Sequence, residues 1–216
     1  MRTFLRSTLI IAALLVCVAV NAQTAVDLLI PNLLPIASNS RNAVVNHPTL
    51  AAFEVEHTIR DAVSKAAKSL AEFPNDTSKA RSFLTPLEEK IAPVGTIPLV
   101  QLQFLLAKLA ELEQKVEEQN YHRAFALALF VTLNRSGNGS TPETAYRIVM
   151  IAEEYDWFGF MQQRWTRKTR VAKDINGKKF DIWTAVSPTG EEREIYFDAS
   201  AMGESIARVF AARGVK

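Results

Sequence analysis

The residues that could do chemistry are acidic and phenolic side chains in the C-terminal half of the chain. Two carboxylates that face each other across a cleft can hydrolyse a glycosidic bond. Glu153 and Glu154 are consecutive where a short helix is expected to begin, so they point to different faces and are not a ready pair. The spacing favours structural roles, and we assign no catalytic residue. The candidates considered are Glu153, Glu154, Asp156, Asp181, Tyr196 and Asp198.

Other familiar catalytic groups lack their partners in this sequence. No Gly-x-Ser-x-Gly nucleophile elbow occurs. His47, His57 and His122 lie in the N-terminal part without a metal-ligand spacing. The only cysteine, Cys17, falls in a segment expected to be removed. We therefore predict no metal site, no cofactor and, on balance, no enzyme.

A glycine-rich turn, Gly137-Asn138-Gly139, precedes these carboxylates. Both residue types tolerate positive φ, which predicts a sharp turn. Thr141-Pro142 then predicts a helix start, with one helical turn at 142–145 and a strand at 146–151. An alternative frame makes Ser140 the cap. The turn lacks the lysine and the spacing of a phosphate loop, so we favour a structural turn over an anion site.

Any site is expected where three segments converge: the 137–142 loop, the start of the helix near residue 153 and the end of the last strand. Together they would bring a polar turn, free backbone N–H groups, carboxylates and tyrosine hydroxyls. The competing interpretation is that these residues cap helices and pin the loop to the sheet. The candidate binding residues are Asn138, Ser140, Glu153, Glu154, Tyr155, Tyr196 and Asp198.

The same residues carry a family resemblance. The stretch SGNGSTPETAYRIVMIAEEY at 136–155, with the later Ile195-Tyr196-Phe197-Asp198, resembles a family of secreted bacterial proteins known only as a domain of unknown function. The shared pattern is a Ser-Gly-Asp/Asn-Gly turn, a Glu-Glu-Tyr and a Tyr-Phe-Asp, and the resemblance covers roughly residues 110–200. It implies a secreted α+β protein and no known activity. Asn138 stands where the family often has aspartate, which argues against a carboxylate ligand there.

Residues 1–22 are typical of a secretory signal peptide. Two arginines form a basic start, and the apolar run at 9–20 is too short for a membrane span. Small residues precede an expected cut after Ala22. The mature chain would be extracytoplasmic, either periplasmic or secreted, and would contain no cysteine for a disulfide or thiolate metal site. A retained membrane anchor is the alternative.

The next two regions are expected to differ in secondary structure. Residues 23–48 contain three prolines among serines and asparagines, which predicts an extended leader. A helical region at 49–135 follows. Apolar periodicity and capping residues predict helices there over 49–72, 77–84, 99–118 and 121–134, with a further helix start at Thr85.

After the glycine-rich turn the pattern changes to strands. We expect strands over 162–173, 179–186 and 194–198, with an Asn-Gly hairpin turn between the first two. A terminal helix is predicted over 201–213. The fold class is therefore α+β: N-terminal helices followed by a small, mostly antiparallel sheet and a C-terminal helix. Residues 136–216 are expected to pack on the helical region as one globular unit.

The net charge of the chain and the charge of its first hairpin limit the kinds of partner expected. The chain has 216 residues and a formal net charge of +2, too small to argue for a nucleic-acid partner. The first hairpin is basic and could hold an anionic glycan, a phospholipid head group or an acidic partner. We favour an exposed strand whose charges guard its edge and pair with Glu191, Glu192 and Glu194. The basic residues, around Trp165, are Arg164, Arg167, Lys168, Arg170, Lys173, Lys178 and Lys179.

Taken together, these features predict an exported, non-catalytic binding or structural protein of the cell envelope. Its partner is unknown, with an envelope protein or an anionic glycan as candidates, and no stable membrane span is expected after signal cleavage. Two alternatives stay open. One is a hydrolase of envelope polymers that uses carboxylates of the C-terminal half. The other is peripheral membrane binding through the basic hairpin at 164–179.

Overall fold

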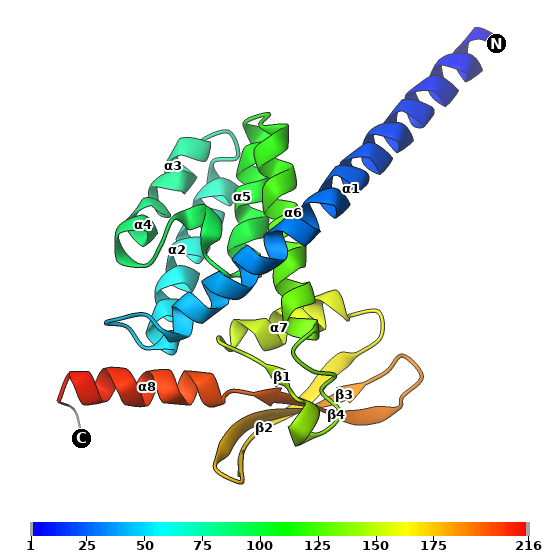
Figure 1. Cartoon of the computed structure of the whole chain (residues 1–216). Helices are drawn as coiled ribbons and strands as arrows, with labels where there is room; N and C mark the ends of the chain where they lie inside the picture. The colour runs from blue at the N-terminus through cyan, green and yellow to red at the C-terminus, as the bar shows by residue number, and fades with distance from the viewer. Residues whose placement is uncertain (1, 215–216) are drawn as a thin grey trace.

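The chain folds as an α+β protein (Figure 1). The structure, a computed structural model, describes the backbone of residues 2–214 and the side chains of residues 23–214. The predicted signal peptide, residues 1–22, lies outside the residues whose side chains are described. Among the described residues, no helix is long and apolar enough to cross a membrane. N-terminal helices, a mostly antiparallel sheet and a C-terminal helix confirm the predicted fold class.

The helices come first along the chain and the strands are concentrated after residue 145. The α-helices are α1 Arg2–Val45, α2 Ala52–Glu72, α3 Thr77–Ser82, α4 Thr85–Lys90, α5 Val100–Leu112, α6 Val116–Asn134, α7 Ala152–Phe160 and α8 Ser200–Ala212. Two short 3₁₀ helices are η1 Val94–Thr96 and η2 Pro142–Thr144. The strands are β1 Tyr146–Arg147, β2 Thr166–Ile175, β3 Lys178–Val186 and β4 Glu192–Asp198.

The extended leader predicted over 23–48 is wrong, because this segment belongs to helix α1 up to Val45. Pro31 and Pro35 lie inside the helix, where each removes a backbone hydrogen-bond donor. Both prolines are on the exposed side. The opposite side is buried against α6, and this packing offsets the lost hydrogen bonds. The buried apolar residues of α1 are Val26, Leu33, Ala37 and Val44.

The helix predicted over 99–118 is also wrong in its second half. It ends at Leu112, and α6 begins at Val116. Gln114 turns the chain with φ +60°, an uncommon value for a residue other than glycine. Glu113 holds the turn through Arg81, whose Nε lies 2.7 Å from Glu113 Oε1. Together α5 and α6 form an antiparallel helix pair.

The four strands form one mixed sheet in the order β1-β4-β3-β2. Strands β2, β3 and β4 pair antiparallel, while β1 pairs parallel with β4. The predicted Asn176-Gly177 turn joins β2 to β3, with positive φ at both residues. The strand predicted over 146–151 is only two residues long. After it, the chain turns inward toward α7, and residues 148–150 are all buried.

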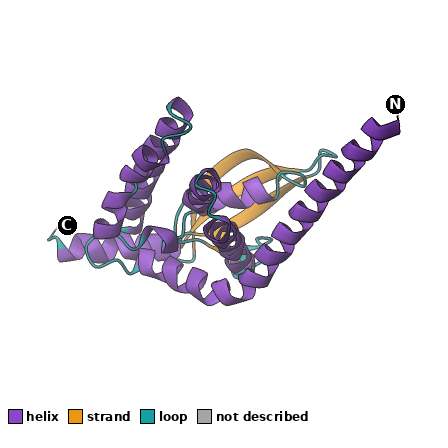
Figure 2. Ribbon diagram, turned by 90° about the horizontal axis from the view of Figure 1, so that it is seen from above, coloured by secondary structure: helices purple, strands orange, loops and turns teal. Residues whose placement is uncertain are grey.

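Helix α7 lies between the sheet and the helical part of the molecule (Figure 1). Seen from above, the helices lie in front of the sheet (Figure 2). Trp183 and Phe197 face α7 and contact Phe158. The alternate residues of the same strands, including Ile182, form a small cluster on the other face with Ala145 and Tyr196.

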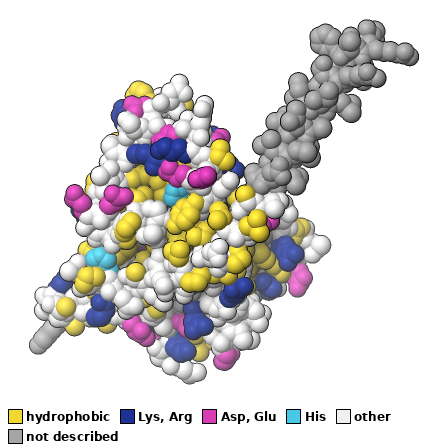
Figure 3. All heavy atoms as spheres, turned by 45° about the horizontal axis from the view of Figure 1, so that its top comes forward, with side chains coloured by type: hydrophobic (Ala, Val, Ile, Leu, Met, Phe, Trp, Pro, Cys, Tyr) yellow, Lys and Arg dark blue, Asp and Glu magenta, His cyan; other side chains and the backbone are white. Residues whose placement is uncertain are grey.

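The first and last helices are tied together by an arginine. Arg208 on α8 donates to the carbonyls of Val45, at 2.6 Å, and His47, at 3.1 Å. It therefore satisfies carbonyls that the end of α1 leaves free. Figure 3 shows that apolar side chains stay exposed in the middle of one face, with charged side chains around them.

Candidate functional site

Helix α7 aims two consecutive glutamates at different parts of the molecule, as the sequence predicts. Glu153 faces α1, where its Oε1 accepts from Arg41 Nε at 2.5 Å. Its Oε2 also accepts from Val149 N at 2.7 Å. Both charged side chains of this pair are less than a tenth exposed. Glu153 therefore fastens α7 to α1.

Glu154 faces the sheet and is fully buried. Its Oε2 accepts from the indole N–H of Trp183 at 2.6 Å and lies 3.2 Å from Arg170 Nε. Arg170 also binds Asp181, with Nη2 2.6 Å from Oδ2. Burial raises the pKa of Glu154, and a hydrogen bond to Asp181 raises it further. This network fixes the orientation of Trp183 and Arg170 on the face of the sheet beneath α7.

The third carboxylate of the helix, Asp156, lies beside Glu153 and Glu56. Burial raises the pKa of Asp156 to about 7, and the negative charges of the two glutamates add to the shift. Glu56 itself accepts from the backbone N–H groups of Ile151, at 2.7 Å, and Ala152, at 3.0 Å, at the start of α7. No group of three acidic, histidine or cysteine side chains among the described residues could hold a metal ion.

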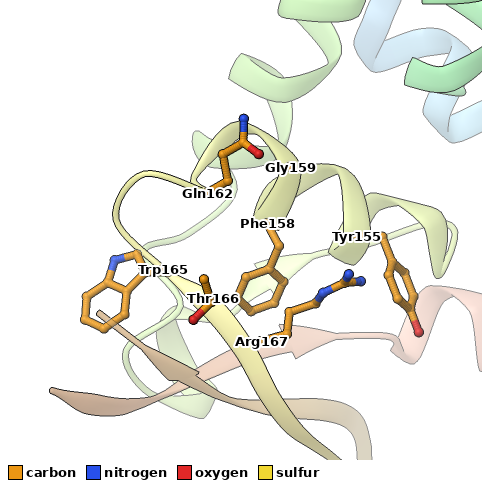
Figure 4. Close-up of a pocket in the computed structure, with 7 residues that line it drawn as sticks. All are labelled: Tyr155, Phe158, Gly159, Gln162, Trp165, Thr166 and Arg167. Carbon is orange, nitrogen blue, oxygen red and sulfur yellow. The ribbon is translucent and has the colours of Figure 1, made fainter. Parts of the chain in front are cut away.

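An open hollow of about 340 Å³ lies beside this network, between α7 and the start of β2. Three aromatic side chains and one guanidinium line it (Figure 4). Arg167 holds its guanidinium over the ring of Tyr155, with Cζ 4.7 Å from the ring centroid. The residues that line the hollow are Tyr155, Phe158, Gly159, Gln162, Trp165, Thr166 and Arg167.

The aromatic side chains that line the hollow are held in place by residues of β3 and β4. Tyr155 and Phe158 are three residues apart on α7, and both rings contact the indole of Trp183 edge-on. Their ring centroids lie 5.7 Å and 5.5 Å from the centroid of Trp183. Trp165 is covered by the guanidinium of Arg193, at 4.0 Å from the ring centroid. Such cation–π contacts are attractive and help to hold a ring in place.

The basic residues of the hairpin divide into paired and unpaired groups. Arg170 pairs inward, Lys168 pairs with Glu192, and Lys179 pairs with Asp174. Of the expected partners, Glu191 and Glu194 form no ion pair with the described residues, so the predicted pairing with β4 is only partly confirmed. The residues without an ion pair to any described residue are Arg164, Arg167, Lys173 and Lys178.

The glycine-rich loop lies at the edge of β4. Asn138 and Ser140 are exposed, and the side chain of Asn138 accepts from the backbone N–H of Ser140 at 3.0 Å. Gly139 O accepts from Tyr196 N at 2.9 Å, which ties the loop to the strand. Asp198 caps α8 by accepting from Ser200 N at 2.9 Å. These contacts match the capping and pinning interpretation.

The structure does not bring the seven predicted site residues onto one surface. Tyr196 pairs across the sheet with Ile182, and Trp183 pairs with Ile195, so Tyr196 and Trp183 lie on opposite faces. Tyr155 and Glu154 contact Trp183, whereas Asp198 is on the face of Tyr196. The expected convergence is therefore wrong, because α7 covers only one face of the sheet. Ligand binding by any of these residues stays a prediction.

Sequence reasoning missed several residues of this region. Arg41 was placed in an extended leader, although it continues the helical spacing of the buried positions in α1. Trp183 and Phe158 were assigned to a strand and a helix but to no site. The signal that could have indicated the hollow is the aromatic residues at 155, 158 and 165 followed by a basic strand.

A protein-family model matches the chain. The model described as Domain of unknown function (DUF4919) matches residues 60–208, well over half of the chain. No curated protein and no solved structure matches the chain. The matched range includes the whole sheet, α7 and the hollow.

Proposed function

The chain belongs to the family of the domain of unknown function DUF4919, and we propose that it is a non-catalytic binding protein of the cell envelope whose ligand is an anionic glycan. One observation carries the proposal. The guanidinium of Arg167, which has no carboxylate partner among the described residues, lies at an open hollow lined by aromatic rings.

The chemistry of the hollow suits a charged sugar. The C–H face of a sugar ring packs on aromatic side chains, and a guanidinium binds a carboxylate through two parallel hydrogen bonds. Tyr155 and Trp165 supply the rings, the buried Phe158 closes the hollow, and Gln162 and Thr166 supply polar groups for hydroxyls. Small-molecule pockets usually measure about 300–1,000 Å³, so this hollow suits one or two sugar units.

The binding groups are held in place before a ligand arrives. Glu154 fixes Trp183, and Trp183 supports both Tyr155 and Phe158. Groups that are already ordered lose less conformational freedom on binding, which increases affinity. The buried network therefore serves the hollow as a rigid support.

The same network supports binding more than hydrolysis. Glu154 and Asp181 are joined through Arg170, and neither of them lines the hollow. A pair of catalytic carboxylates must reach the scissile bond of a bound sugar. The proposal therefore gives these carboxylates a positioning role.

The test is binding of an oligogalacturonate, measured by isothermal titration calorimetry. Its methyl ester has the same sugar rings without the charge and serves as the matched ligand. We expect the acid to bind and Arg167→Gln to weaken it by about tenfold, roughly 1.4 kcal/mol. Arg164→Gln removes a neighbouring exposed arginine and is the control, with unchanged affinity.

Four results would reject this proposal. Equal binding of acid and ester, or no effect of Arg167→Gln, would remove the role of the guanidinium. Shortening of the oligosaccharide during incubation would favour the hydrolase alternative. Binding to anionic vesicles that is lost at high salt, with no binding of glycan, would favour membrane association through the hairpin.

The proposal places the protein outside the cytoplasm, after removal of a signal peptide that ends at Ala22. The basic start and the short apolar run of residues 1–22 support this location.

A further inference from the structure

The sheet ends in a long strand whose outer edge is open. β2 is last in the strand order, and nine of its ten residues are exposed while the tenth is half-buried. An antiparallel edge strand directs the N–H and C=O groups of every second residue outward. The backbone of β2 can therefore form hydrogen bonds with a further strand.

A seven-residue part of this edge is regular. The register between β2 and β3 shifts between Arg167 and Thr169, where a bulge interrupts the pairing. From Thr169 to Ile175 the register with β3 is unbroken. The hollow described above lies on the other side of the bulge, at Thr166 and Arg167. The two surfaces are therefore separate.

The open edge is positively charged. Between Thr169 and Ile175, the single acidic residue, Asp174, is held by Lys179 at 2.5 Å. Lys173 has no ion pair with any described residue, and Lys178, the first residue of β3, has none either. Val171 is 59% exposed on the same side of β2 as Lys173, because the two residues are two apart. An apolar position and a free cation thus lie next to each other along the edge.

These features favour an acidic strand as the partner of β2. A second copy of β2 would bring like charges together, so edge-to-edge pairing between copies is disfavoured. An acidic strand would instead place its carboxylates beside Lys173 and Lys178. Natural proteins protect edge strands with lysine charges, bulges, short length or proline, and β2 has the first two, in Lys173 and the bulge between Arg167 and Thr169. These devices act against a like-charged strand, whereas the regular part of β2, which has no proline, still offers its backbone to a strand of opposite charge.

We propose that the Thr169–Ile175 edge of β2 binds an extended acidic segment of a partner protein, which pairs as a fifth strand of the sheet. Backbone hydrogen bonds give such strand addition its affinity, and side-chain positions two apart give its selectivity. The preferred segment has an acidic residue beside Lys173 and an apolar residue beside Val171.

The experiment uses the whole mature chain and a seven-residue peptide that alternates glutamate and valine. Amide hydrogen exchange is followed by NMR over β2. We expect protection of every second amide between Thr169 and Ile175 when the peptide is added. Lys173→Glu should weaken binding by about tenfold. Lys90→Glu, an exposed residue of α4 without an ion pair to the described residues, makes the same charge change and should have no effect.

Two further peptides separate strand addition from simple charge attraction. The same sequence methylated on every backbone nitrogen keeps its charges but cannot donate to the sheet, so it should not bind. A lysine–valine peptide keeps the backbone but reverses the charge, and it should not bind either. Retained binding of the methylated peptide, or uniform protection along β2, would overturn the proposal. Arg167→Gln should leave peptide binding unchanged, which separates this surface from the glycan hollow.

Discussion

At the scale of single residues, His122 is the buried group whose protonation matters most to the helical part. Gln103 Nε2 donates to Ile97 O at 2.8 Å, so Gln103 Oε1 is left to accept from His122 Nδ1, also at 2.8 Å. Burial lowers the pKa of His122 to about 4, although the charge of Glu118 opposes the shift. The imidazole is therefore neutral in the folded protein at mild acidity.

This shift predicts a loss of stability in mild acid. An unfolded histidine takes up a proton near pH 6.5, and the folded one does so only near pH 4. Between these values the unfolded state binds more protons at this site, so the stability that His122 contributes falls with falling pH, by about 3 kcal/mol in all. The raised pKa values of Glu154 and Asp156 act in the opposite direction, so urea unfolding at pH 7.5 and pH 4.5 is compared between the parent and a His122 variant. The His122→Gln variant should lose less stability between the two pH values than the parent protein. His57→Gln, at an exposed histidine, should lose as much stability as the parent.

The glycine-rich loop gives a second prediction at this scale. Gly139 has φ +70°, and a Cβ there would lie 2.5 Å from the ring of Tyr146. Gly190 has φ +85° but open space around it. Gly139→Ala combines backbone strain with a steric clash, so it should destabilise the protein by about 2–3 kcal/mol. Gly190→Ala carries the strain alone and should cost about 1 kcal/mol. Equal thermal shifts for the two variants would contradict the predicted clash.

At the scale of elements, α1 shows why sequence patterns can mislead. Its buried residues Val26, Leu33 and Val44 are spaced in helical steps, but Pro31 and Pro35 suggest a break. Proline is disfavoured within a helix because it removes a donor and meets the preceding turn. Here both prolines face outward, and tertiary packing decides the outcome. In contrast, the Asn-Gly turn and the strands beside it are predicted correctly, because their signals are local, except that the first strand begins at Thr166 and not at residue 162.

The Arg41–Glu153 pair predicts how firmly α1 is held. Removing one member of a buried ion pair leaves a buried charge without compensation, so Arg41→Ala should destabilise the protein by about 3–5 kcal/mol. Lys65→Ala breaks the exposed pair with Asp61 and should cost less than about 1 kcal/mol. Urea denaturation compares the two. Adding Glu153→Gln to Arg41→Ala should restore part of the loss, since the stranded charge is removed.

At the scale of the whole molecule, the fold class follows from the sequence but the arrangement of the site does not. Alternation predicts which strand residues share a face, yet not which face a helix covers. Tyr155 and Tyr196 were expected together and lie on opposite faces of the sheet. The contact between Arg41 and Glu153 joins residues more than a hundred positions apart, and no local pattern contains that information.

The proposed export makes a prediction about the mature chain. Mass spectrometry of periplasmic or secreted material should find Gln23 as the first residue, because the signal peptide would end at Ala22. The first buried side chain among the described residues is Val26, so cleavage leaves the packed part of α1 intact. Recovery of the full-length chain in membranes would instead indicate a retained anchor.

The hydrogen bonds from Arg208 to the end of α1 have a consequence for biosynthesis. They join positions 161 and 163 residues apart, so the donor is made long after α1. Helix α1 must therefore wait for α8 before these carbonyls are capped. Contacts of such long range slow folding. A chain truncated before residue 200 would lack Arg208, and the carbonyls of Val45 and His47 at the end of α1 would lose their donor.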